Sequence, residues 1–277
     1  MYSLATKFAT EALSSCLAIY FGLGVVANDH LIQTKGGSFG FGFIALGFGM
    51  AFAIPIIMFG FVSAHLNPAM SLALFILDKM DYKEFLVCVG GEFLGMFVGA
   101  VLTFVHYFPH FRLTPNTDAF FPPGGDVEKQ DSEEIKNDQK RKLATFVTGP
   151  AVKVHWVHTF INELMCTTTL LVCALGVYSR HSQLENSDTF LLYRCFEGLS
   201  IGWLVFVAVL GHGGVTSIAA NPARDFSPRL AHWILPIRNK GSSKWSYAWI
   251  PFVATFAGGA LASQIFRGIS MLTGYGV

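Results

Sequence analysis

Charged residues are scarce in this chain: they make up 13% of its 277 residues, against about 25% in an ordinary soluble domain. Hydrophobic residues make up 52%, and a soluble fold of this length needs more polar surface to stay dispersed. Five cysteines are too few for a disulfide-stabilised secreted scaffold. The net charge of +1 argues against nucleic acid as a partner. These shortages leave an integral, multi-pass membrane protein.

Six apolar runs are long enough to cross a bilayer, which takes about 20 residues of helix. They lack the two-residue alternation of a barrel strand, so we expect helices. The first run has no basic leader region and no small-residue cleavage site, so we expect it to remain as a span. The predicted spans are residues 8–27, 41–61, 84–108, 156–178, 190–210 and 248–272.

Two further apolar segments, residues 67–77 and 221–230, are too short to cross, and their length is more typical of re-entrant half-helices. Each begins with Asn-Pro-Ala. Asn is a favoured helix N-cap, and proline at the first helical position loses no hydrogen bond. The triplets Asn67-Pro68-Ala69 and Asn221-Pro222-Ala223 therefore predict two helix starts.

The chain also contains an internal repeat. Glu11 in the first predicted span has a counterpart 152 residues later in Glu163, and Asn67 and Asn221 lie 154 residues apart. Each half holds three spans, so the second half must cross in the opposite sense. Inverted repeats with broken helices are a transport architecture. We therefore predict an all-α membrane protein, with six transmembrane helices and two re-entrant half-helices as an inverted three-plus-three repeat around a central pore.

This repeat divides the chain into a first half at residues 1–108, a connection at residues 109–153 and a second half at residues 154–277. The connection is polar, and its positive and negative charges balance. Such a composition predicts a solvated, partly flexible loop.

Over almost its whole length the sequence resembles the major intrinsic proteins, the family of the aquaporins and aquaglyceroporins. The resemblance rests on Ser63-Ala64-His65-Leu66-Asn67-Pro68-Ala69, on Asn221-Pro222-Ala223-Arg224-Asp225, and on the two glutamates of the repeat. Asp225 after Arg224, with Arg229 four residues later, is similar to the glycerol-conducting branch. The resemblance implies a homotetramer of independent pores in the plasma membrane. Each pore would pass glycerol, other small neutral polyols and water.

The two half-helices are expected to meet tip to tip, with their positive dipole ends at the centre of the membrane, where they repel cations. Asn67 and Asn221 would cap their helices through the amide oxygen and leave their NH2 donors for the lumen. The unwound chain before each tip, residues 61–65 and 215–220, would line the lumen with carbonyl acceptors.

Charged residues at membrane depth mark functional sites. Arg224 would bind hydroxyl groups and repel cations, or it would form a structural ion pair with Asp225. For Asp225, capping and packing are as plausible as contact with the solute. Glu11 and Glu163 would accept hydrogen bonds from the re-entrant loops; the alternative is a proton relay.

The resemblance places Phe48 at the constriction, and spacing from Asn221 adds Val209 and Ile218 opposite Arg224. These four residues would form a slot with an apolar wall on one side and the N–H donors of the Arg224 guanidinium group on the other. The alternative puts His212 in the place of Val209, which needs a three-residue contraction in the loop and narrows the pore to water. His65 would form hydrogen bonds in the lumen or act as a pH gate.

Glu92 occupies a place where relatives tend to carry glutamine. The sequence offers no nucleotide-binding loop, no metal-ligand cluster and no nucleophile–base pair, so we expect no cofactor and no enzyme. A structural membrane protein that does not conduct is the remaining alternative.

Overall fold

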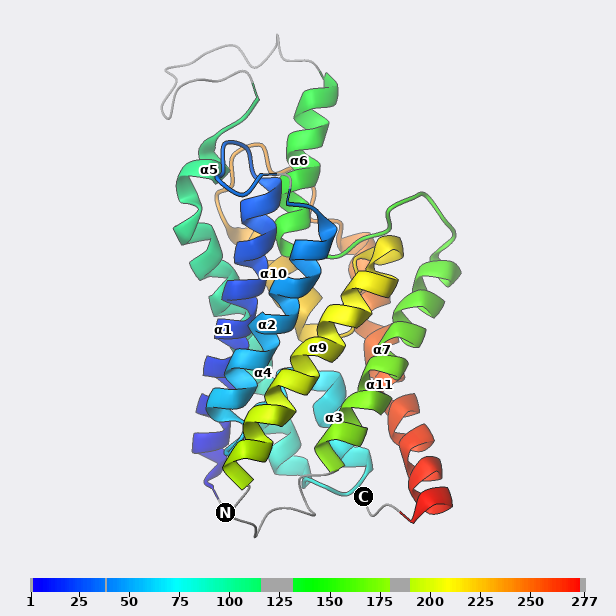
Figure 1. Ribbon diagram of the computed structural model, residues 1–277. Helices are drawn as coiled ribbons and strands as arrows, with labels where there is room; N and C mark the ends of the chain where they lie inside the picture. The colour runs from blue at the N-terminus through cyan, green and yellow to red at the C-terminus, as the bar shows by residue number, and fades with distance from the viewer. Residues whose placement is uncertain (1, 38, 116–131, 180–189, 275–277) are drawn as a thin grey trace.

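The computed structural model describes residues 2–37, 39–115, 132–179 and 190–274, almost entirely as helices (Figure 1). The helices are α1 (Leu4–His30), α2 (Phe41–Phe59), α3 (Pro68–Ile76), α4 (Tyr82–His106), α5 (Phe108–Arg112), α6 (Ser132–Phe146), α7 (Trp156–Ser179), α9 (Phe190–Thr216), α10 (Pro222–Ile234) and α11 (Trp245–Thr273).

Six of these helices are long and apolar enough to cross a membrane: α1, α2, α4, α7, α11 and the part of α9 at Leu192–Thr216. The six predicted spans are thus confirmed, with differences of a few residues at their ends. The largest difference is in α9, which continues past residue 210 to Thr216. A continued helix keeps backbone groups paired where the bilayer offers no water.

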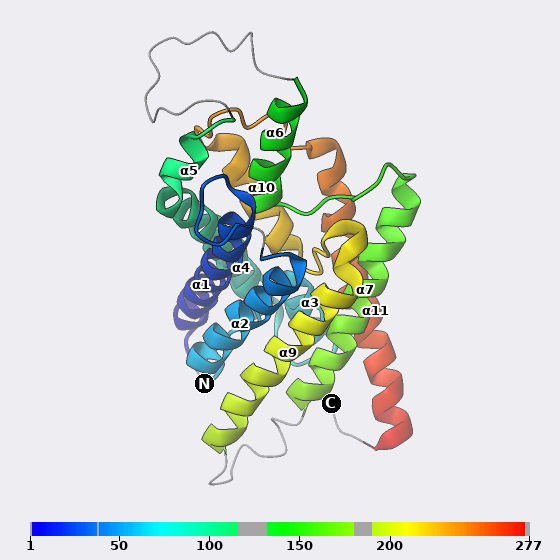
Figure 2. The ribbon, with the colours of Figure 1, turned by 45° about the horizontal axis from the view of Figure 1, so that its top comes forward.

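The two halves run in opposite directions, as predicted. Both termini lie at one end of the molecule, which is the bottom in Figure 1; α1 begins there, whereas α7 begins at the opposite end (Figures 1 and 2). Helix α1 packs on α4, α2 on α9, and α7 on α11. The half-helices α3 and α10 lie in the lower and upper halves and reach towards each other.

Helix α10 runs to Ile234, four residues beyond the predicted end. Its last turns contain Arg229, inside the predicted segment, and His232, beyond its predicted end. Both side chains are fully buried. His232 Nδ1 lies 2.8 Å from Ser243 Oγ, so the polar groups in these turns have partners inside the protein.

Glycines allow the helices of each half to approach closely. A Cβ atom on Gly95 of α4 would lie 2.1 Å from the carbonyl oxygen of Ala12 in α1. A Cβ atom on Gly259 of α11 would lie 2.4 Å from the carbonyl oxygen of Ala69 at the start of α3. Small residues at such crossings are the usual means of close packing in membranes.

The prediction that residues 109–153 form a solvated loop is wrong for the described part of this segment. Residues 109–112 belong to α5, and α6 packs against α1 and α10. Phe111 and Phe146 are fully buried. The sequence is mostly charged, but α6 gathers its few apolar residues on one face and pairs the charges there. Residues 116–131 lie outside the described part.

The ammonium group of Lys142 holds α6 in place. Lys142 Nζ donates to the Oδ2 atom of Asp138 at 2.8 Å, to the Leu113 carbonyl oxygen at 2.7 Å and to the Arg238 carbonyl oxygen at 2.8 Å. These three bonds use all three donors of an ammonium group. Burial lowers the pKa of Lys142, and the bond and charge of Asp138 oppose that shift. The group thus ties α6 to two separate loops.

Gly95→Ala is expected to destabilise the protein by about 1–3 kcal/mol, because the added methyl group must push α1 and α4 apart. Gly90→Ala, in the same helix, is the matched control, since its Cβ atom would meet only Phe8 at 3.6 Å. The measurement is thermal unfolding in detergent. Equal midpoints for the two variants would contradict the close contact.

Lys142→Met leaves the Asp138 carboxylate buried without its cation, and breaking a buried pair in this way costs about 3–5 kcal/mol. Amide hydrogen exchange in α6 should therefore accelerate by roughly 100-fold or more, while exchange in α1 and α4 stays unchanged. Lys140→Met removes an exposed charge from the same helix and should leave this protection intact. If amide hydrogen exchange in α6 is equally slow in both variants, Lys142 does not hold the helix in place.

Candidate functional site

The two half-helix tips exchange a pair of hydrogen bonds. Asn67 Nδ2 donates to the Ala220 carbonyl oxygen at 2.9 Å, and Asn221 Nδ2 donates to the Leu66 carbonyl oxygen at 2.6 Å. Each amide oxygen caps its own helix: the Asn67 oxygen accepts from the backbone N–H of Ala69 at 3.0 Å, and the Asn221 oxygen accepts from those of the second and third residues after it.

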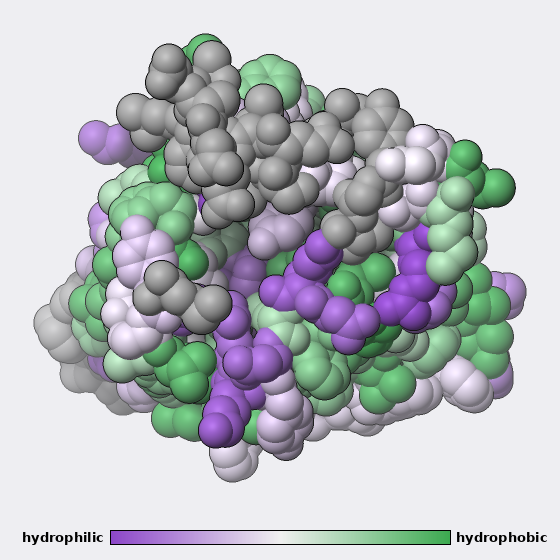
Figure 3. All heavy atoms as spheres, turned by 90° about the horizontal axis from the view of Figure 1, so that it is seen from below, coloured by the Kyte–Doolittle hydropathy of each residue, from purple (hydrophilic) through white to green (hydrophobic). Residues whose placement is uncertain are grey.

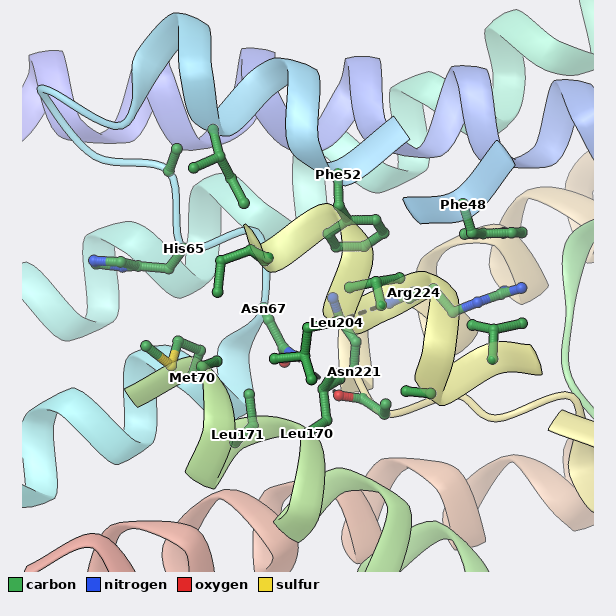
Figure 4. Close-up of a pocket in the computed structure, with 18 of the residues that line it drawn as sticks. Phe48, Phe52, His65, Asn67, Met70, Leu170, Leu171, Leu204, Asn221 and Arg224 are labelled. Carbon is green, nitrogen blue, oxygen red and sulfur yellow. Dashed lines mark hydrogen bonds between the residues drawn. The ribbon is translucent and has the colours of Figure 1, made fainter. Parts of the chain in front are cut away.

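This exchange corrects one expectation from the sequence. Both N–H groups of each asparagine were expected to face the lumen, but one N–H of Asn67 and one of Asn221 hold the opposite loop. An amide has two donors, so each side chain keeps one for another partner. Both residues line the cavity described below (Figure 4).

The residues before the two asparagines have a left-handed backbone. Leu66 has φ 59° and Ala220 has φ 49°, and Ile218 stands at φ 43°. This region disfavours residues with a Cβ atom, most of all a β-branched one. The unwound second segment begins at Ser217, two residues later than expected, since Val215 and Thr216 are still helical. The strained backbone is held by the contacts around it.

Glu11 and Glu163 lie on equivalent positions and brace the two unwound loops. Glu11 accepts hydrogen bonds from Ser63 Oγ at 2.6 Å, from the His65 N–H at 2.8 Å and from the Leu66 N–H at 3.1 Å. Both carboxylates are fully buried. These contacts are the ones expected of a carboxylate that supports the re-entrant loop.

Glu163 accepts hydrogen bonds in the same way from Thr216 Oγ1 at 2.6 Å, from the Ala219 N–H at 3.0 Å and from the Ala220 N–H at 3.3 Å. The two glutamates therefore satisfy backbone donors that no helix pairs.

Glu92 of α4 is a further fully buried carboxylate, and it lies in the first half. Its Oε1 atom accepts from Ser71 Oγ at 2.7 Å and from the Asn67 N–H at 3.2 Å. Its Oε2 atom has no hydrogen-bond partner among the described residues.

A cavity of about 620 Å³ passes the half-helix tips. Its lining extends from Lys7 and Glu84, near the end with the termini, to His30 and Phe41 near the opposite end. On the face that carries the termini, hydrophilic residues gather near the middle, and hydrophobic ones lie further out (Figure 3). Such a distribution fits a polar route through a lipid-facing exterior.

The predicted filter residues Phe48, Val209, Ile218 and Arg224 all line this cavity. The guanidinium carbon of Arg224 lies 4.7 Å from the centroid of the Phe48 ring. Arg224 Nη1 donates to the Phe146 carbonyl oxygen at 3.3 Å, so the end of α6 helps to fix it. Figure 4 shows Arg224 and Phe48 side by side, with Phe52 on the same wall.

Val209 and His212 differ clearly in position. Val209 is half-buried and lines the cavity, whereas His212 is exposed and is not among the lining residues. Both residues belong to α9. The geometry therefore favours Val209.

Asp225 does not pair with Arg224. Its two oxygens accept from Arg229 Nε at 2.9 Å and Nη2 at 2.7 Å, and from Thr148 Oγ1 at 2.6 Å and N at 2.9 Å. Arg229 is fully buried and also donates to the carbonyl oxygens of Thr148 and Ser243. Asp225 thus anchors the chain after α6 instead of facing the cavity.

His65 lines the cavity close to the first tip. Its Nδ1 atom lies 3.1 Å from Ser71 Oγ and 3.2 Å from Glu11 Oε1. Cys88 of α4 adds a thiol, so that one potential ligand atom each from Glu11, His65 and Cys88 lie within 4.8 Å of one another. Spacing along the chain did not predict this grouping of potential ligand atoms.

Sequence reasoning expected carbonyl acceptors in the segment that contains Ala220, but it missed those of Leu66 and Phe146, because carbonyl positions carry no residue-type signal. It missed Thr148 and Lys142 because both lie in a segment read as loop. For Cys88, the spacing of four residues to Glu92 was visible, but only the packing of α4 on α1 brings it to Glu11 and His65.

Comparison with known proteins places these features in a family. The family described as "Major intrinsic protein" matches residues 2–266. A "Probable glycerol uptake facilitator protein" of Thermotoga maritima is 35% identical over 261 residues, covering 94% of this chain and 97% of the relative. A "Glycerol uptake facilitator protein" of Bacillus subtilis is 33% identical, covering 95% and 84%.

Among solved structures, the aquaglyceroporin from Plasmodium falciparum superposes with a TM-score of 0.72 at 23% identity, and the match covers 98% of each chain. At that identity the likeness establishes the fold. The span count, the two half-helices and the family match agree: the chain is a multi-pass integral membrane protein and belongs to the major intrinsic protein family.

Proposed function

We propose that this protein is a passive channel that conducts glycerol, other small neutral polyols and water, and that excludes protons and ions. It is not an enzyme. The observation that carries the proposal is the cavity that passes both half-helix tips, with an apolar wall on one side and amide and guanidinium donors on the other. The glycerol facilitators among its relatives support the choice of permeant.

The constriction suits a polyol because it offers two unlike sides. Phe48, Val209 and Ile218 present carbon to the carbon backbone of the permeant, and Arg224 offers N–H donors to its hydroxyl groups. Asn67 and Asn221 offer further donors midway. A molecule that loses water contacts on entering regains hydrogen bonds along the path, so no energy source is needed.

Cations are excluded by charge rather than by size alone. The N-termini of α3 and α10 meet at the tips, each with a partial positive charge of about half an elementary charge. Arg224 adds a full charge at the constriction. A cation would lose its hydration shell and meet repulsion, while a neutral solute meets neither cost to the same extent.

Family resemblance further supports a homotetramer in the plasma membrane, with one pore in each chain. The half-repeats at residues 1–108 and 154–277 would together line that pore. The connection at residues 109–153 would supply part of the outer wall, since Ala144 and Val147 line the cavity.

The decisive test measures water and glycerol permeability of proteoliposomes by light scattering. Vesicles with the protein should shrink and reswell in a glycerol gradient faster than bare lipid, and they should shrink faster in sucrose. They should carry no ionic current. Folded protein without any permeability gain would point to the structural role, and water conduction without glycerol conduction would point to a water-selective channel.

The filter assignment has its own test. Val209→His places a larger, polar ring on the apolar wall, so glycerol permeability should fall by roughly tenfold or more while water permeability falls less. His212→Ala is the control in the same helix and should leave the glycerol-to-water ratio unchanged, because His212 is exposed away from the cavity. The assignment is wrong if His212→Ala changes the ratio and Val209→His does not.

A further inference from the structure

The first half of the repeat gathers three different ligand types beside the cavity. The carboxylate of Glu11, the imidazole of His65 and the thiol of Cys88 come from three separate elements, α1, the first unwound loop and α4, and they converge within 4.8 Å. Glu11 and Cys88 are fully buried, while His65 and Ser63 line the cavity. The cluster is therefore reached from the lumen.

The second half of the repeat lacks this cluster although its architecture is the same. Glu163 matches Glu11, but the position that matches His65 is Ala219. Gly95 and Gly258 approach equivalent carbonyl groups, those of Ala12 and Leu164.

Cys88 lies seven residues before Gly95, and Pro251 lies seven residues before Gly258, so Cys88 corresponds to Pro251. The imidazole and thiol are additions to the first half, and the fold does not require them.

The surroundings of the cluster favour a cation. Glu11 and Glu92 are fully buried there, and among the described residues neither forms an ion pair with Lys or Arg, whereas Glu84 pairs with Lys7. The buried Glu92 lies two hydrogen bonds from His65, through Ser71, and its Oε2 atom has no hydrogen-bond partner among the described residues.

The ligand set defines the class of ion. A mixed oxygen, nitrogen and sulfur set suits Zn²⁺ and its heavier analogue Cd²⁺, and it does not suit Mg²⁺ or Ca²⁺, which prefer oxygen alone. Tetrahedral Zn²⁺, with bonds of about 2.0–2.3 Å, sets its ligand atoms roughly 3.5 Å apart. His65 Nδ1 and Glu11 Oε1 are already 3.2 Å apart, so the thiol of Cys88 is the group that needs to approach. Three protein ligands leave the fourth position for water from the cavity.

We propose that Glu11, His65 and Cys88 form a binding site for a zinc-like divalent cation, and that the bound ion blocks the pore. The thiol gives up its proton to cavity water as the metal–sulfur bond forms, while the carboxylate and the neutral imidazole bind through lone pairs. Binding draws Glu11 away from the N–H groups of His65 and Leu66, which loosens the first loop. It also places positive charge in the lumen beside the first tip.

Cd²⁺ is the probe for binding, because its bond to a thiolate absorbs in the ultraviolet. Purified full-length protein should bind one Cd²⁺ per chain with this absorption, and Zn²⁺ should compete for the site. Cys88→Ser should abolish the absorption. His65→Ala should weaken binding by roughly tenfold or more, since even the loss of an outer partner of a metal ligand costs that much.

Two control variants separate the site from the other thiols. Cys166→Ser removes a buried cysteine of the second half, and Cys173→Ser removes an exposed one. Both should bind Cd²⁺ like the wild type. Equal binding by Cys88→Ser and the wild type, or loss of binding in Cys166→Ser, would overturn the proposal.

The block is tested separately from binding. Zn²⁺ should reduce glycerol permeability of wild-type proteoliposomes, a chelator should restore it, and Cys88→Ser should conduct equally with and without Zn²⁺. The basal glycerol permeability of Cys88→Ser should match that of the wild type, which shows that the variant is folded. Binding without any effect on permeability would refute the block, and a protein that conducts no glycerol at all would refute the proposed channel while leaving the binding result to stand.

Discussion

The structure depends on how a broken backbone is satisfied inside a bilayer. Two helices that end halfway across the membrane expose N–H and carbonyl groups at a depth where lipid offers them no hydrogen-bond partner. Each asparagine resolves both problems at once: its oxygen caps its own helix, and its NH2 group binds the carbonyl oxygen that the opposite loop presents. The left-handed Leu66 and Ala220 aim those carbonyls, and Glu11 and Glu163 bind the N–H groups behind them. A change at either tip therefore affects both loops.

On this symmetric frame, the chemistry comes from positions where the halves differ. Arg224 corresponds to Met70 and Asp225 to Ser71, so the charged constriction belongs to the second half alone. The buried acid Glu92 belongs to the first half. In the alignment of the two halves that matches Gly95 with Gly258, Glu92 corresponds to Thr255. Ser71 and Asp225, at equivalent positions, bind quite different partners: Ser71 donates to Glu92, and Asp225 accepts from Arg229 and Thr148. One backbone thus places Arg224 at the cavity in one half and the buried acid Glu92 in the other.

The sequence predicted what depends on local pattern and left out what depends on distant packing. The spans follow from unbroken apolar runs, and the half-helices follow from a cap, a proline and a length too short to cross. Helix α6 escaped prediction because its burial rests on Lys142 and Asp138, which look like solvated charges until Leu113 and Arg238 bring their carbonyls to them. The choice between Val209 and His212 was open in sequence because it turns on the length of the loop before Asn221; in the structure Val209 lines the cavity, and His212 is not among the lining residues. The meeting of Cys88 with His65 needs the approach of α4 to α1, which no spacing reveals.

The pairing of Asp225 decides how Arg224 can serve the proposed channel. A carboxylate beside the filter arginine would neutralise its charge and occupy its donors, and the constriction would then repel cations weakly and bind hydroxyl groups poorly. Arg229 prevents this, because it takes both Asp225 oxygens into a buried pair that also holds Thr148. Among the described residues, the guanidinium group of Arg224 then donates one hydrogen bond, to the Phe146 carbonyl oxygen, and it packs against the Phe48 ring. A guanidinium group has five donors, so most remain for a passing solute. In the proposed channel, Asp225 would therefore affect selectivity without touching the solute: because it binds Arg229, the charge of Arg224 has no carboxylate partner at the cavity.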